Sequence, residues 1–207
     1  MYISAGRGPR QLSLLPVSLI LASGSPRRAE LLTAAGFTFE IVPADIDETS
    51  VAGEPHADYA QRIARAKAHR VAGLHPTDIV LAADTVVVGD GRLMGKPVNR
   101  QDAASMLKTL SGRTHDVHTA VVVRGPHGQA EELVTTRVQF QVLSDAEIGW
   151  YLDTGEPEGK AGAYGIQGRA SRFIEWIEGS WSNVVGLPIS TVYRLLKVVD
   201  YGTPGRF

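Results

Sequence analysis

The sequence predicts an α/β protein with a mixed β-sheet arranged in two lobes. In the first half, short apolar runs alternate with helical patterns, which is typical of parallel α/β units. In the second half, two long β patterns flank the turn at residues 125–128, which predicts a long hairpin. The chain has 207 residues, 43% of them hydrophobic, which is enough for one large domain with a proper core.

The first elements follow in order along the chain. Residues 19–22 are a short apolar run and predict a buried strand. A helix should follow, because Ser25 can cap it, Pro26 suits its first position and Gly36 can end it. Apolar and polar residues then alternate from Phe37 to Ile41, which predicts a half-buried strand ending at Pro43.

The middle of the chain continues this alternation. After an acidic loop, residues 54–72 form an alanine-rich helical pattern that Gly73 should end. Residues 79–88 are the most apolar run and predict a central strand, and Asp90-Gly91 predicts a hairpin turn into residues 92–94.

The remaining predicted elements are three helices, three strands and a turn. They are a helix from Asn99 closed by Gly112, strands at 114–123 and 133–143, a helix with a Ser144–Glu147 capping box ending near Asp153, a strand at 173–177, a turn at 181–188 and an amphipathic helix at 190–199.

Composition excludes several functional classes. The net charge of −1 argues against a nucleic-acid stripe or a polybasic membrane surface. No apolar run approaches the roughly 20 residues that a membrane span needs. Without cysteine the chain has no disulfide, zinc finger or thiol nucleophile, which fits a cytoplasmic protein. We expect residues 1–16 to be a disordered leader or extension, residues 17–200 a single domain of two lobes, and residues 201–207 a loose tail.

An anion site is predicted where the first strand meets the first helix. The turn Ser23-Gly24-Ser25 offers hydroxyls and free backbone N–H groups, and Arg27 and Arg28 follow in the first helical turn. The helix dipole favours acidic residues there, so a pair of arginines indicates that a negative ligand, such as phosphate, arrives from outside. The alternative is a surface helix start with two solvated arginines.

A carboxylate inside a central apolar strand is costly unless it is paired, so Asp84 is a candidate site residue. It could instead mark the end of the strand and cap a turn. Asp47 and Glu48 add acidic groups, and Lys67 and Lys96 add cations. Such a set suits metal-assisted water attack on a phosphate, with the carboxylates on the metal and the cations on the phosphates.

Other candidates are weaker. His115 and His118 lie three apart in a strand pattern and should face opposite sides, so ordinary strand positions are favoured over a metal pair. The three tryptophans could stack a base, but core or interface packing is the favoured role. The glycines of segment 159–168 lack the strand and helix that a dinucleotide fingerprint needs.

Several motifs occur together and in order: LASGSPRRAELL from residue 21, DIDE at 45–48, IARAKA at 63–68, AADTVV at 82–87, GKP at 95–97, SGRTH at 111–115, KAGAYGIQG at 160–168 and VVGLPI at 184–189. In these motifs the chain resembles the Maf family of nucleoside triphosphate pyrophosphatases over roughly residues 18–197.

The resemblance implies a two-lobed fold similar to the inosine triphosphatase-like proteins, with a long mixed sheet, flanking helices and a central cleft. It implies cleavage of a nucleotide between its α and β phosphates with a divalent cation such as Mg²⁺, Mn²⁺ or Co²⁺. Asp84 matches the proton acceptor. The residues that match positions around phosphates and metal are Ser23, Arg27, Arg28, Glu48, Lys67 and Lys96, with Glu48 and Asp84 as the expected metal ligands.

The same resemblance bears on the substrate and the assembly. Arg27, Thr85 and Gln167 match members that act on dTTP and UTP, and a homodimer is expected. Two alternatives stay open: the same reaction on a purine or modified nucleotide, or a regulatory protein linked to septum formation that only senses nucleotides.

Overall fold

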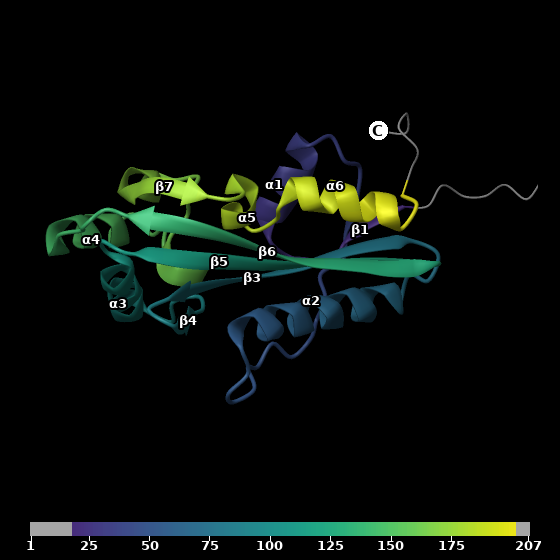
Figure 1. The fold of residues 1–207 in the computed structure, drawn as a ribbon, viewed down its shortest axis with the longest axis horizontal. Helices are drawn as coiled ribbons and strands as arrows, with labels where there is room; N and C mark the ends of the chain where they lie inside the picture. The colour runs from purple at the N-terminus through teal and green to yellow at the C-terminus, as the bar shows by residue number, and fades with distance from the viewer. Residues whose placement is uncertain (1–17, 202–207) are drawn as a thin grey trace, which may run out of the picture.

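The computed structural model describes residues 18–201, which form a seven-stranded mixed sheet with helices on both faces (Figure 1). The predicted fold class is therefore confirmed. The leader expected at residues 1–16 and nearly all of the expected tail lie outside the described residues.

The strands run in the order β2-β1-β3-β5-β6-β7, and β4 pairs with β3 off this path. The short strand β1 pairs in parallel with β2 and β3, and every other pairing is antiparallel. The bounds are β1 (Leu19–Leu21), β2 (Glu40–Ile41), β3 (Ile79–Gly89), β4 (Arg92–Met94), β5 (Thr114–Gly125), β6 (Gly128–Phe140) and β7 (Ile174–Glu178).

Different helices pack against the two ends of the sheet. The helices α1 (Pro26–Ala34) and α6 (Ile189–Val198) cover one face, and α2 (His56–Ala72) covers the opposite face (Figure 1). A separate apolar cluster fills the other end of the sheet, where α3 (Arg100–Leu110), α4 (Asp145–Leu152) and the 3₁₀ turns η1 (Ala161–Ala163) and η2 (Arg169–Phe173) lie. The long strands β3, β5 and β6 run through both ends and join the two lobes.

An alanine stripe lets α2 pack close to the sheet. Ala60, Ala64 and Ala68 recur every four residues, so they share one face of the helix, and all three are fully buried. They belong to the same cluster as Ala82 of β3 and Ala120 of β5. This close approach brings Lys67, the neighbour of Ala68, against the middle of β3.

Most local signals are confirmed. The side chain of Asn99 accepts a hydrogen bond from the Asp102 N–H at 2.9 Å, and both hydrogen bonds of the Ser144–Glu147 capping box are present. Pro26 is the first residue of α1, as predicted, but the side chain of Ser25 makes no capping hydrogen bond. The backbone N–H of Ser25 donates to the Ser23 hydroxyl at 3.3 Å.

Three predictions about local structure are wrong. The strand expected from Phe37 is reduced to Glu40–Ile41, because only these residues reach the edge of β1, and Ile41 stays 52% exposed. Residues 181–188 do not form a turn: Trp181–Val185 is the helix α5, capped by the Ser180 hydroxyl. The strand expected from residue 133 starts at Gly128, because the long partner β5 pairs with the polar residues after the turn.

The tryptophans are not in the core. Trp150, Trp176 and Trp181 are 39–46% exposed, so the core half of the prediction is wrong, and packing at an interface stays a prediction. The prediction that His115 and His118 occupy ordinary strand positions agrees with the structure. His115 is buried against Phe140 and Tyr164, whereas the His118 ring bonds the Thr135 hydroxyl on the exposed side.

Candidate active site

A cleft of about 560 Å³ lies between the two lobes. Its lining comes from the turn before α1, from α2 and β3, from the loop after β4 and from the glycine-rich segment 159–168. All nine residues expected to form the site line it: Ser23, Arg27, Arg28, Glu48, Lys67, Asp84, Thr85, Lys96 and Gln167. Asp47, the other acidic candidate, does not line the cleft and instead accepts hydrogen bonds from Thr49.

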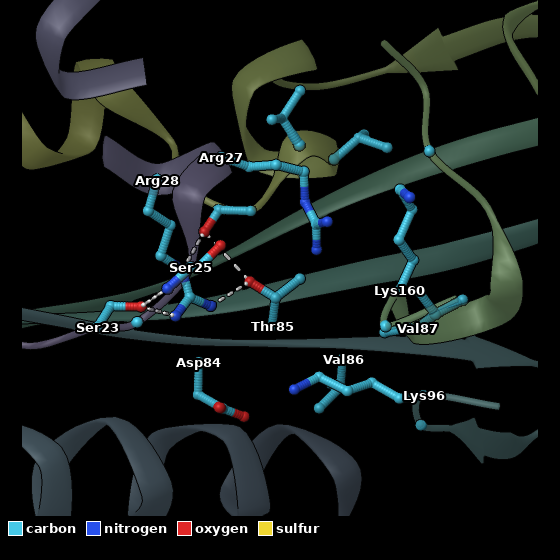
Figure 2. Close-up of a pocket in the computed structure, with 18 of the residues that line it drawn as sticks. Ser23, Ser25, Arg27, Arg28, Asp84, Thr85, Val86, Val87, Lys96 and Lys160 are labelled. Carbon is cyan, nitrogen blue, oxygen red and sulfur yellow. Dashed lines mark hydrogen bonds between the residues drawn. The ribbon is translucent and has the colours of Figure 1, made fainter. Parts of the chain in front are cut away.

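Arg28 is built into the protein. Its guanidinium donates to the Ser23 hydroxyl at 2.9 Å, to the Thr85 hydroxyl at 3.0 Å and, through Nε, to the Gly186 carbonyl at 2.9 Å (Figure 2). Burial lowers the pKa of Arg28, and the nearby Asp84 carboxylate acts in the opposite direction. These bonds fix the start of α1 to β3 and leave part of the five-donor guanidinium for a ligand.

Two carboxylates share one ammonium on the opposite side of β3. Lys67 Nζ lies 2.8 Å from Asp84 Oδ1 and 2.8 Å from Glu48 Oε1. The side chains of Lys67 and Asp84 are each 10% exposed, whereas that of Glu48 is 49% exposed. Burial raises the pKa of Asp84, and the attraction of Lys67 and Arg28 opposes the rise. A partly desolvated carboxylate with a raised pKa is suited to accepting a proton.

Arg27 and Lys96 approach the same space from two sides (Figure 2). Arg27 is half-buried and Lys96 is exposed. Over residues 18–201 neither side chain forms an ion pair with a carboxylate. Both are therefore placed to pair with an anionic ligand in the cleft.

Thr85 and Gln167 occupy different settings. The Thr85 hydroxyl is already bonded to Arg28, lies 3.0 Å from the Thr119 hydroxyl and donates to the Gly186 carbonyl at 3.3 Å. Gln167 is exposed on the lining, where its amide can offer a donor and an acceptor. Thr85 thus shapes the cleft through Arg28, while Gln167 faces it directly.

The donor set fits a divalent cation only in part. Among the described residues, no group of three or more His, Cys, Asp or Glu side chains could hold a metal. Glu48 and Asp84 do supply two carboxylates that reach a common point, since both contact Lys67 Nζ. Magnesium-type ions are often held by one or two carboxylates with ligand phosphates and waters completing the shell, so these residues fit such an ion once a phosphate is present.

Two residues contribute to the site although sequence patterns do not predict them. The Gly186 carbonyl accepts a hydrogen bond from Arg28, 158 residues away, and the VVGLPI motif that contains Gly186 does not predict this contact. Lys160 lines the cleft opposite α1. Lys160 lies in the glycine-rich segment, and that position alone does not indicate a role in the site.

Known proteins are similar to this chain over nearly the same residues that the structure describes. The Maf-like protein family matches residues 18–199. A dTTP/UTP pyrophosphatase of Koribacter versatilis is 51% identical over 183 residues, covering 88% of this chain and 95% of the relative. One of Myxococcus xanthus is 50% identical over 188 residues, covering 91% and 95%. The solved Ham1 protein of Staphylococcus aureus is 14% identical, covers 59% of this chain and 71% of its own, and superposes with a TM-score of 0.44, a likeness too weak to bear on function.

Proposed function

This chain belongs to the Maf family, and from that membership we propose that it hydrolyses dTTP and UTP to the nucleoside monophosphate and pyrophosphate. Relatives at 51% and 50% identity over most of both chains carry the name dTTP/UTP pyrophosphatase. The observation that carries the proposal is the buried Asp84 carboxylate, which lies in one cleft with the arginine-bearing start of α1.

The phosphates would be bound at the start of α1. The helix N-terminus and Arg27 line the cleft, and Arg28 holds the turn in place while its remaining N–H groups would bind the ligand. Lys96 would neutralise charge on the departing pyrophosphate. Fixed donors of this kind stabilise developing charge without reorganising during the reaction.

Asp84 would accept the proton of the attacking water. Lys67 holds Asp84 and Glu48 in position, and burial raises the pKa of Asp84 against the opposing attraction of Lys67, which favours a carboxylate that can take up a proton. Glu48 and Asp84 are the residues that would hold the divalent cation. When bound, the cation would supply charge neutralisation and a more acidic water at the α-phosphorus.

Selection of a pyrimidine would depend on Gln167. Its exposed amide can pair with the adjacent donor and acceptor on a uracil or thymine edge. Thr85, bonded to Arg28 and Thr119, would set the wall beside it rather than read the base.

The direct test is pyrophosphate release from a panel of dTTP, UTP, dCTP, GTP and ATP with Mg²⁺, Mn²⁺ or Co²⁺. We expect dTTP and UTP to be the best substrates. Asp84→Asn should lower turnover by about 10²–10⁴-fold, the usual contribution of general base catalysis. Its circular dichroism spectrum should match the parent's, because asparagine can still accept a bond from Lys67. Nucleotide binding without pyrophosphate release would refute the enzymatic proposal, and preference for a purine would refute the assigned substrate.

A further inference from the structure

Lys160 is held in one conformation at the rim of the cleft. Its ammonium donates to the Glu156 carbonyl, and its stem lies over Gly165, where an added Cβ would fall 3.0 Å from Lys160 Cε. The absence of a side chain at residue 165 is therefore what lets the lysine lie flat. Its side chain is half-buried and lines the cleft (Figure 2).

The segment that carries Lys160 is itself anchored. The Glu156 carboxylate accepts from the Tyr151 hydroxyl at 2.9 Å and from the Arg169 N–H at 2.9 Å. Gly168 leaves the space that this carboxylate occupies, since a Cβ there would collide with it. The glycines of the motif thus have a packing reason: they fit around Lys160 and Glu156.

The charges around Lys160 point to an anionic ligand. Burial and repulsion from Arg27 both lower the pKa of Lys160, with weaker compensation from Glu156 and Glu158. Arg27 and Lys96 face the same cleft from other elements. In the part of the chain that the structure describes, none of these three cations forms an ion pair with a carboxylate. The repulsion between Lys160 and Arg27 would be relieved by an anion lying between them.

We propose that Lys160 binds the terminal phosphate of the nucleoside triphosphate, closing with Arg27 and Lys96 a subsite of three cations around the pyrophosphate end. This inference rests on the proposed function, since it assigns a further contact within the same cleft. Arg27 holds this end from α1, Lys96 from the loop after β4 and Lys160 from the glycine-rich segment. A diphosphate would leave the Lys160 contact unmade, so Lys160 selects for triphosphates.

The test compares Lys160→Met with Lys108→Met. Methionine keeps most of the apolar stem over Gly165 and removes the charge. Lys108 is a matched control, because it lies on α3 outside the cleft and pairs with Asp145 on the surface. Binding is measured by calorimetry with inorganic pyrophosphate, a non-hydrolysable α,β-methylene analogue of dTTP, and dTDP.

Lys160→Met should weaken pyrophosphate and the triphosphate analogue about tenfold, or about 1.4 kcal/mol, with a smaller effect on dTDP. Lys160→Arg should retain binding, and Lys108→Met should leave it unchanged. The subsite is refuted if Lys160→Met binds the triphosphate analogue like Lys108→Met, or weakens dTDP as much as the analogue. Because the ligands are not turned over, this result is read separately from pyrophosphate release, and a thermal melt checks that the variants are folded.

Discussion

Replacing Lys67 by methionine is expected to lower the free energy of unfolding by about 3 kcal/mol near pH 8. The side chains of Lys67 and Asp84 are each 10% exposed and meet at 2.8 Å, so the variant leaves a desolvated carboxylate without its ammonium. Losing one partner of a buried pair costs about 3–5 kcal/mol. The lower end applies here, because Arg28 still attracts Asp84. Glu48, whose side chain is 49% exposed, adds about 1 kcal/mol at most.

A double-mutant cycle isolates the pair. Asp84→Asn and the combined variant are measured with Lys67→Met by urea unfolding at the same pH. Removing both charges should recover much of the loss, giving a coupling of about 2 kcal/mol between the two positions. Lys108→Met, which breaks a pair whose side chains are 57% and 84% exposed, should cost about 1 kcal/mol or less. Effects of Lys67→Met and Asp84→Asn that add within about 0.5 kcal/mol would show that the two groups do not interact, and the reasoning would fail.

Two further predictions concern the lobe that carries the glycine-rich segment. Burial lowers the pKa of His115 from its ordinary 6.5 to about 4. The neutral, buried imidazole therefore makes its full contribution to the free energy of unfolding above pH 6.5, and about 3 kcal/mol is lost as the pH falls towards 4. Urea unfolding between about pH 7 and about pH 4.5 should show this slope, and replacing both His115 and its partner Tyr164 by phenylalanine should flatten it; an unchanged slope would assign the effect to other groups. Gly168→Ala should push the Glu156 carboxylate off its backbone N–H donors and lower the free energy of unfolding by about 1–3 kcal/mol. The control Gly149→Ala has open space at its Cβ and should be neutral or stabilising. Equal thermal midpoints for the two variants would contradict this.

Local sequence determined most of the elements. The apolar run at 79–88, the Asn99 cap and the Ser144 capping box each depend on residues a few positions apart, so their physics is visible in the chain itself. The same holds for the turn at 23–25 followed by two arginines, which predicts an anion site; these residues line the cleft. The helix α5 was missed because the apolar and small residues around Trp181 give no clear period over five positions.

Tertiary structure alone decided how the site residues meet. Lys67 reaches both Glu48 and Asp84 because an alanine stripe lets α2 press against β3, a contact that no spacing in the sequence reveals. Arg28 is fixed by a carbonyl 158 residues away. Lys160 lines the same cleft as residues of α1 and α2, which lie far from it in the chain. Periodicity and capping act between neighbours in the chain, whereas these contacts depend on how two packed layers dock, and that is settled by the whole core at once.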